Sequence, residues 1–194
     1  MCIRDRHETT ALALTFALRE VGLRPKLGAA LRDEALRAAA GGPLYGSHLP
    51  QLTLARSVLL EAMRLYPPAW AIGREVITPF ELRGWSLEPG DQLLMPQWLV
   101  HRDPRWFTAP RTFAPERWGE GSRGMARPKM SYFPFGGGAR VCIGQHFAMV
   151  EGTLALAGLC RRIQVHTVHD REVPLLAGIT LRPTAPIHVR CTPW

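Results

Sequence analysis

The residues best suited to chemistry form a glycine-rich run that contains a cysteine. Residues 135–144 read Phe-Gly-Gly-Gly-Ala-Arg-Val-Cys-Ile-Gly, and an apolar segment follows them. A cysteine just before a helix lies at the positive end of the helix dipole and near unpaired backbone N–H groups, which both favour the thiolate. Gly138 and Gly144 let the backbone approach a flat ligand, because they have no Cβ, and Arg140 can pair with a carboxylate. The run therefore predicts that Cys142 binds iron as a thiolate.

The spacing within this run resembles a known family signature. It is similar to the heme-binding motif of the cytochrome P450 family, F-x-x-G-x-R-x-C-x-G, with every fixed position filled. The resemblance implies that Cys142 is the axial ligand to the iron of heme b, that Arg140 binds a heme propionate and that Phe135 packs near the sulfur. The alternative, a free buried cysteine beside a surface loop, is disfavoured because five residues match at fixed spacing.

Glu61 and Arg64 stand at i and i+3 of a predicted helix, where their side chains are neighbours. On a surface, such a pair is common and contributes little to stability. The cytochrome P450 family, however, pairs its E-x-x-R helix with an arginine from a Pro-Glu-Arg-Phe segment, and residues 115–118 read Pro-Glu-Arg-Trp. The resemblance implies a buried structural triad of Glu61, Arg64 and Arg117, with Trp118 in place of phenylalanine.

Glu8 and Thr9 stand at the head of an apolar segment. They resemble the acid–alcohol pair on the distal helix of the cytochrome P450 family, which implies that they deliver protons through water during dioxygen activation. The alternative is a helix N-terminus with a capping residue and an acid near the dipole.

Arg74 resembles the strand arginine that binds the second heme propionate in the family, and its alternative is an ordinary surface arginine. Residues 69–72 and 177–179 resemble segments that line the substrate pocket of the family. Both segments are apolar. The resemblance therefore implies an apolar small-molecule substrate.

Hydrophobic periodicity predicts the elements that position these residues. Helices are expected over residues 9–21, 26–40, 52–65 and 145–162, with Gly22 as the C-cap of the first. Short antiparallel strands are expected within residues 72–96 and 165–194, and residues 101–130 form an irregular meander. The fold class is mainly α with small β-sheets, and the resemblance implies the C-terminal portion of the cytochrome P450 fold.

The composition is that of a globular protein. Of the 194 residues, 46% are hydrophobic and 21% are charged, which predicts a packed core. The net charge of +8 indicates either a solvated, arginine-rich surface or a docking face for an acidic partner. Nucleic acid is disfavoured, because no binding motif and no basic stripe with interleaved aromatic residues is present.

The four cysteines are widely spaced and form no C-x-x-C pair. This spacing disfavours both a zinc site and a dense disulfide framework, and it indicates a reducing, cytoplasmic location. No apolar run reaches the roughly 18 residues of a membrane span, and an anchor in a region upstream of these residues stays an open alternative.

The first six residues do not fit the resemblance. The family normally has small residues where Asp5 and Arg6 stand, and two charges buried there would cost several kcal/mol. We therefore expect residues 1–6 to be a non-native segment and residues 7–194 to be the C-terminal part of a single cytochrome P450 domain.

The resemblance implies a heme-thiolate monooxygenase, an oxidoreductase that activates dioxygen and inserts one oxygen atom into its substrate. No flavin or nicotinamide motif is present, so the electrons must come from a ferredoxin or flavodoxin-like donor. Basic residues can attract such a donor to the face near Cys142. The residues expected to do so are Arg123, Arg127, Lys129, Arg161 and Arg162.

Two alternative functions stay open. A heme-thiolate peroxygenase would use peroxide and would not need the Glu8–Thr9 pair, and a truncated remnant would bind heme without catalysis. We expect the 194 residues alone to be inactive and prone to aggregation, because the apolar helix over residues 9–18 would remain partly uncovered.

Overall fold

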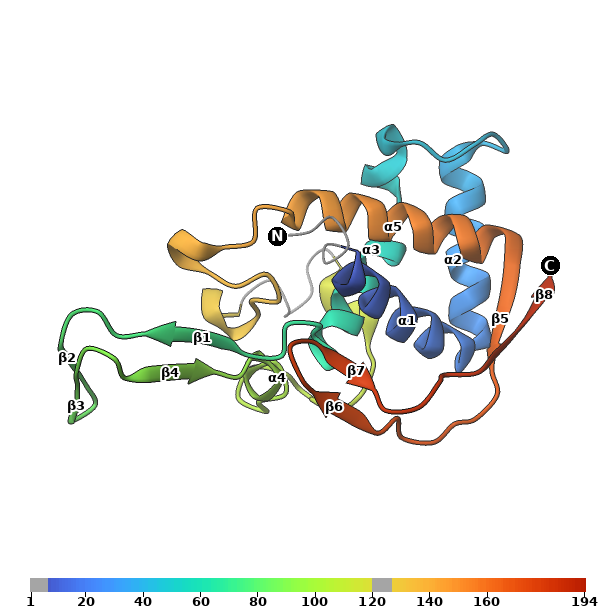
Figure 1. Ribbon diagram of the computed structural model, residues 1–194. Helices are drawn as coiled ribbons and strands as arrows, with labels where there is room; N and C mark the ends of the chain where they lie inside the picture. Colours follow the sequence, from blue (N-terminus) through green and yellow to red (C-terminus); the bar gives the residue numbers. More distant parts are fainter. Residues whose placement is uncertain (1–6, 120–126) are drawn as a thin grey trace.

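The computed structural model describes residues 7–119 and 127–194 of the chain (Figure 1). The expectations for Asp5, Arg6 and Arg123 lie outside these residues. The helices are α1 (Glu8–Gly22), α2 (Pro25–Ala39), α3 (Thr53–Leu65), α4 (Gln97–Val100) and α5 (Gln145–Arg162), with the 3-10 helices η2 (Gly46–Gln51), η3 (Pro115–Trp118), η5 (Lys129–Ser131) and η6 (Gly138–Arg140). The four predicted helices form within one residue of their predicted bounds, and the mainly helical fold class is confirmed.

Eight short strands form four separate two-stranded antiparallel sheets in the described part of the chain. The pairs are β1 (Ile72–Glu75) with β4 (Gln92–Met95), β2 (Phe80–Leu82) with β3 (Trp85–Leu87), β5 (Ile163–Thr167) with β8 (Val189–Pro193), and β6 (Leu175–Ala177) with β7 (Leu181–Pro183). Arg83 and Gly84 connect β2 to β3 with φ angles of 50° and 85°. Positive φ at both central residues matches the right-handed twist of a tight hairpin. The segment from β1 to β4 forms a long ribbon that extends from the helical body (Figure 1).

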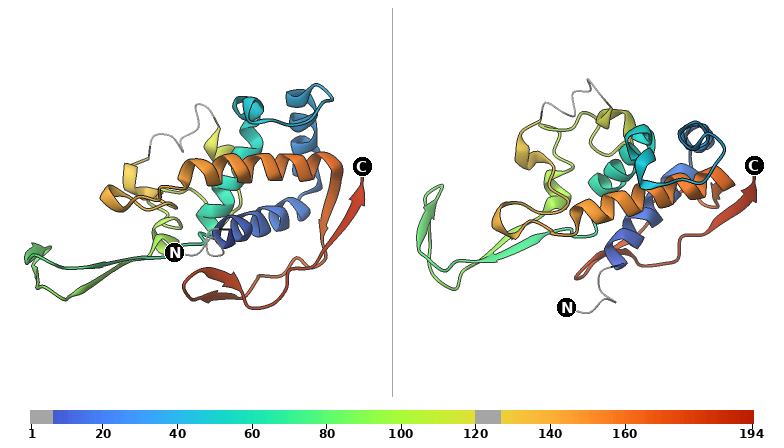
Figure 2. Two further views of the ribbon diagram at one scale, coloured as in Figure 1. Left: turned by 45° about the horizontal axis from the view of Figure 1, so that its top comes forward. Right: turned by 90° about the horizontal axis from the view of Figure 1, so that it is seen from above.

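The body of the molecule consists of four packed helices. Helix α5 packs against α2 and α3, and α1 packs against α3 and α5 (Figures 1 and 2). Their apolar faces meet in a large core cluster, which includes Ala17, Leu31, Ala55, Val58, Leu156 and Ala157. Among the described residues, no helix is long and apolar enough to cross a membrane.

Gly152 brings α5 close to α3. A Cβ at this position would lie 2.7 Å from Leu59 Cδ2, so only glycine fits without a shift. This contact joins the helix that follows Cys142 to the helix that carries Glu61. The two motifs are therefore held by one rigid pair of helices.

Glu34 of α2 caps the N-terminus of α3 from outside that helix. Its carboxylate accepts hydrogen bonds from the backbone N–H groups of Leu54 at 2.6 Å and Ala55 at 2.9 Å, and from the Thr53 hydroxyl at 3.3 Å. The first N–H groups of a helix lack partners within the helix, and a negative charge there also complements the dipole. The buried Glu34 side chain therefore fixes where α3 begins.

The predicted role of Gly22 as a C-cap is wrong. Helix α1 includes Gly22, and the capping residue is Leu23 in a right-handed conformation. A Cβ at Gly22 would lie 2.5 Å from Thr167 Oγ1 and 2.8 Å from Thr167 N. Glycine is needed here because β5 crosses the end of α1 in contact with its backbone.

Candidate cofactor site around Cys142

The loop before α5 holds Cys142 in a defined backbone conformation. The N–H of Cys142 donates to the carbonyl of Phe135 at 2.9 Å, which closes the loop formed by residues 135–142. Gly136 and Gly138 have φ angles of 79° and 70°, in the left-handed region that favours glycine. Three residues after the cysteine, α5 begins at Gln145 without a side-chain cap. The structure thus places Cys142 at the positive end of an 18-residue helix.

The thiol of Cys142 is free and exposed. Large apolar side chains around it are exposed as well: Ile143 is 97% accessible and Phe147 is 69% accessible, with Val141 and Met130 also exposed. A Cβ on Gly138 would meet no atom of the described residues within 4 Å, so the space beside this part of the loop is open with respect to them. An exposed apolar patch of this kind marks a binding surface.

The two arginines expected to bind propionates lie on different elements. Arg140 ends η6 within the loop and is exposed, and Arg74 lies on β1, where it is half-buried and donates to the carbonyl of Gly73 at 2.8 Å. Strand β1 passes close to the loop, because a Cβ on Gly136 would lie 3.5 Å from Ile72 Cδ1. Ile72 and Arg74 share one face of the strand.

The three residues of the predicted triad form one buried cluster. Arg64 makes a two-point ion pair with Glu61, from Nε to Oε2 and from Nη2 to Oε1, each at 2.9 Å. Arg117 Nε donates to Glu61 Oε1 at 3.0 Å. Neither Glu61 nor Arg64 is accessible to solvent. The Glu61 carboxylate also accepts hydrogen bonds from the backbone N–H of Ala114 at 2.9 Å and from the ring N–H of Trp118 at 2.8 Å.

Arg64 also organises the meander that follows α4. Its guanidinium donates to the carbonyls of His101 at 2.8 Å, Pro110 at 2.6 Å and Thr112 at 3.0 Å. These bonds use the donors that do not face Glu61, so a buried cation is satisfied on all sides. The E-x-x-R helix therefore fixes the path of the irregular segment between residues 101 and 117.

His101 connects this cluster to the residues before the cysteine loop. Its Nε2 accepts the N–H of Phe133 at 2.9 Å, and its ring packs against Tyr132. Burial, with the nearby charges of Arg64 and Arg102 adding to it, lowers the pKa of His101 to about 3. The imidazole is therefore neutral and serves as a hydrogen-bond acceptor.

The structure places Glu8 and Thr9 in the first turn of α1. Thr9 is exposed, whereas the carboxylate of Glu8 faces the tail of the chain, where it accepts a hydrogen bond from the Thr180 hydroxyl at 2.8 Å. His7, the capping position, makes no side-chain cap.

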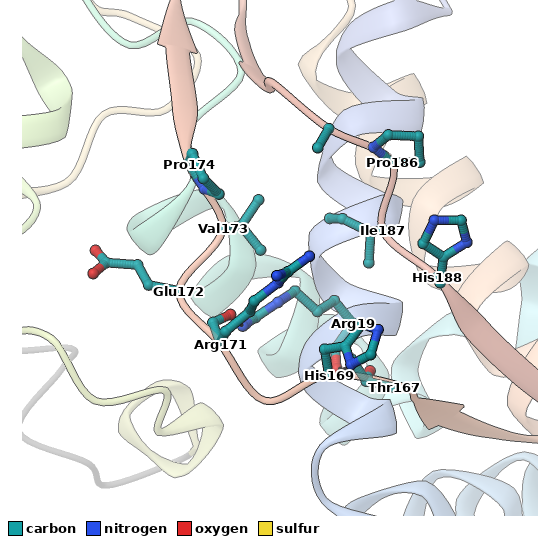
Figure 3. Close-up of a pocket in the computed structure, with 11 residues that line it drawn as sticks. Arg19, Thr167, His169, Arg171, Glu172, Val173, Pro174, Pro186, Ile187 and His188 are labelled. Atoms are coloured by element: carbon teal, nitrogen blue, oxygen red, sulfur yellow. Dashed lines mark hydrogen bonds between the residues drawn. The ribbon is translucent and has the colours of Figure 1, made fainter.

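A small cavity of about 50 Å³ lies between α1 and the tail, away from these motifs (Figure 3). It is lined by Arg19 and by residues of the segments 167–174 and 185–188. A cavity of this size holds a few water molecules. None of the predicted site residues lines it.

The comparisons with known proteins agree on one family. A cytochrome P450 profile matches residues 6–189. Cyclooctatin synthase from Streptomyces melanosporofaciens is 39% identical over 166 residues, which cover 86% of this chain and 36% of that protein. Cytochrome P450 3A13 from Mus musculus is 33% identical over 170 residues, covering 87% and 34%. Cytochrome P450 CYP72A616 from Paris polyphylla is 31% identical over 177 residues, covering 91% and 34%.

The chain therefore belongs to the cytochrome P450 family. It spans about a third of the length of these relatives. Membership implies a heme cofactor, and the residues around Cys142 fit one. A free, exposed thiol at a helix N-terminus can bind iron, and the open apolar surface beside it can accept a flat apolar ring.

Sequence reasoning missed three contributors to the site. The N–H of Trp118 binds Glu61, which the phenylalanine usual in the family could not do. Glu34 caps α3, and its position among the apolar residues of α2 was the available signal, because a charge on the buried face of a helix needs a partner. Thr180 binds Glu8 from 172 residues away, and no local pattern indicates this contact.

Proposed function

We propose that the chain is the heme-ligating part of a heme-thiolate monooxygenase. One observation carries the proposal: the free thiol of Cys142 is exposed beside an open apolar surface, in a loop closed by the hydrogen bond from Cys142 N to Phe135 O. Bound at this thiolate, heme b would supply reductive activation of dioxygen and insertion of one oxygen atom into an apolar substrate. The relatives that share the family support this reaction class.

The other residues of the site hold and orient the cofactor. Arg140 and Arg74 would bind the two propionates, and Phe135 would pack near the sulfur. Gly138 and Gly144 keep the face of the loop open, since a Cβ on Gly144 would lie 3.8 Å from Cys142 Sγ. The buried cluster of Glu61, Arg64 and Arg117 would have a structural role: it would hold the backbone that supports the cysteine loop, and it would not touch substrate.

Proton delivery is the proposed role of Glu8 and Thr9. Both lie in the first turn of α1, where a half-exposed carboxylate can take a proton from solvent and a hydroxyl can pass it on through water. A peroxygenase is the second candidate, and it would not depend on this pair. Replacing Thr9 with alanine therefore separates the two reactions, because only the monooxygenase would lose reducing equivalents as peroxide.

The proposed electron donor is a ferredoxin or flavodoxin-like protein. Lys129 is exposed close in sequence to the cysteine loop, whereas Arg161 binds the carbonyls of Gly41 and Gly42 at the opposite end of α5. That end lies about 27 Å from the cysteine end, given the rise of a helix. The donor would therefore dock at the Lys129 end, and Arg161 and Arg162 would contribute mainly to long-range attraction.

We further propose that residues 7–194 form the C-terminal part of a single cytochrome P450 domain located in the cytoplasm, and that residues 1–6 are a non-native segment. The 194 residues alone would bind heme weakly and would not turn over substrate. The exposed patch around Ile143 and Phe147 supports this proposal, because an uncovered cofactor edge admits water.

Titration of the 194-residue chain with hemin tests the assignment of the ligand. Reduction under carbon monoxide should give the red-shifted absorption band of a thiolate-ligated heme, and Cys142→Ala should abolish that band. Cys191→Ala is the matched control, because Cys191 is also free and exposed but lies on β8. A band that survives in Cys142→Ala, or that is lost only in Cys191→Ala, would show that Cys142 is not the ligand.

A further inference from the structure

Thr180 contacts the one carboxylate that the proposed proton-delivery pair contains. Its hydroxyl donates to Glu8 Oε1 at 2.8 Å. Thr180 is 8% accessible, and buried hydroxyls in proteins are almost always hydrogen-bonded. The bond therefore fixes one rotamer of a glutamate that would otherwise sample several.

The turn that carries Thr180 is anchored independently of Glu8. Trp70 Nε1 donates to the carbonyl of Gly178 at 2.7 Å, and Leu181 N donates to the carbonyl of Pro68 at 2.9 Å. Both partners lie in the segment that follows α3. Hairpin β6–β7 thus lies below the first turns of α1 in a position set by α3 (Figures 1 and 2). Thr180 is consequently the fixed member of the pair and Glu8 the positioned one.

Arg182 makes a weaker contact with the same carboxylate. Its Nε lies 3.8 Å from Glu8 Oε1, and the side chains of Arg182 and Glu8 are 50% and 43% accessible. Exposed ion pairs of this kind contribute little, because solvent screens them. The hydroxyl of Thr180, not the guanidinium, sets the orientation of the carboxylate.

We propose that Thr180 is a positioning residue for proton delivery, which holds the Glu8 carboxylate so that it can supply the relay through Thr9. This inference rests on the proposed function of Glu8 and Thr9. In each transfer, Glu8 gains a proton from solvent water and passes one on through water towards the Thr9 hydroxyl. Thr180 neither gains nor loses a proton. A relay works only while its members stay within hydrogen-bond reach, so loss of the tether slows it.

A double-mutant cycle on the 194-residue chain tests the tether without heme or turnover. Glu8→Ala and Thr180→Val should be non-additive by at least about twofold in the unfolding equilibrium constant. Thr184→Val is the matched control, because Thr184 lies in the same tail and donates instead to Pro174 O at 3.3 Å. It should be additive with Glu8→Ala. Additivity of Thr180→Val with Glu8→Ala would overturn the inference.

The fraction of reducing equivalents lost as peroxide tests the consequence in a heme-loaded longer family member that contains this chain. Thr180→Val should raise this fraction about threefold, and Thr180→Ser, which keeps the hydroxyl, should restore it. A rise in Glu8→Gln without a rise in Thr180→Val would overturn the inference while leaving the role of Glu8 intact. No rise in either variant would show that Glu8 does not deliver protons, and the inference would then fall with that role.

Discussion

At the scale of single residues, the most constrained group is the carboxylate of Glu61. Its two oxygens accept five hydrogen bonds, from Arg64 Nε and Nη2, Arg117 Nε, Ala114 N and Trp118 Nε1. A buried carboxylate is tolerated only when it is paired and fully hydrogen-bonded. Loss of one partner lowers the stability of the fold, because the desolvation of the carboxylate is then no longer compensated. The backbone path of the meander therefore depends on the hydrogen bonds that its own residues donate to Glu61.

Trp118→Phe should destabilise the chain, because it removes one N–H donor from Glu61 while keeping an aromatic ring. We expect a loss of about 1–3 kcal/mol in the free energy of unfolding, measured by urea denaturation. Trp98→Phe is the matched control, since the buried N–H of Trp98 has no hydrogen-bond partner among residues 7–119 and 127–194. That variant should change stability much less. Equal effects of the two substitutions would contradict the prediction.

His101 predicts a pH dependence of stability. Burial lowers its pKa to about 3 from 6.5, so between these values the unfolded chain binds more protons at this residue than the folded chain does. The contribution of neutral His101 is therefore complete above about pH 6.5 and is lost as the pH falls towards 3, at up to about 1.4 kcal/mol per pH unit. His101→Gln, which offers Phe133 N another acceptor, should lose this slope. The test is to measure urea midpoints of the original chain and of His101→Gln between about pH 3 and 6.5. The same dependence of the midpoint on pH in both proteins would contradict the prediction.

At the scale of elements, close approach between secondary structures decides which glycines are required. Gly22 lies against the backbone of Thr167 at the crossing of α1 and β5, and Gly152 lies against Leu59 where α5 meets α3. Gly28, in the first turn of α2, has only the ordinary contact of a Cβ position 3.5 Å from Val21 Cγ1. The space around each glycine therefore decides whether an alanine would fit there.

Gly22→Ala and Gly28→Ala should have opposite effects on stability. At Gly22 the new methyl group would lie 2.8 Å from a backbone nitrogen, so β5 must move, at a cost of about 1–3 kcal/mol. At Gly28 the methyl group fits, and alanine is favoured over glycine within a helix by up to about 1 kcal/mol, so Gly28→Ala should raise the free energy of unfolding. Thermal unfolding of both variants tests the two predicted changes in stability. A stabilised Gly22→Ala would show that α1 and β5 are not packed as described.

At the scale of the whole molecule, two uncovered apolar regions stand out. One surrounds Cys142, and the other lies along the ribbon from β1 to β4, where Ile77 is 85% and Trp85 is 76% accessible. An isolated two-stranded ribbon is only marginally stable in water. The chain spans about a third of the length of its relatives.

Hemin should stabilise the folded chain, since a ligand that binds only the native state raises its free energy of unfolding. Above the dissociation constant, each tenfold increase in free hemin should add about 1.4 kcal/mol, measured as a shift in the urea midpoint. Cys142→Ala should lose most of this shift, whereas Cys191→Ala should keep it. A shift that survives in Cys142→Ala would mean that hemin binds non-specifically to the apolar surface.

The sequence by itself predicted the four long helices and the glycine-rich cysteine loop before the last of them. Helical periodicity is local, so four helices were predicted within one residue, and the run from Phe135 to Gly144 has fixed spacing that needs no tertiary information. The resemblance also named Glu61, Arg64 and Arg117 as a set. Their common cluster is an outcome of the folded structure.

The tertiary structure alone decided which distant groups satisfy the buried polar atoms. Glu34 caps α3 across a loop, Trp118 adds a donor to Glu61, and Gly22 makes room for β5 instead of ending a helix. Thr180 reaches Glu8 because the tail is anchored beside α3. Each contact joins residues far apart along the chain, and its partner is chosen by packing geometry, which local propensity does not encode.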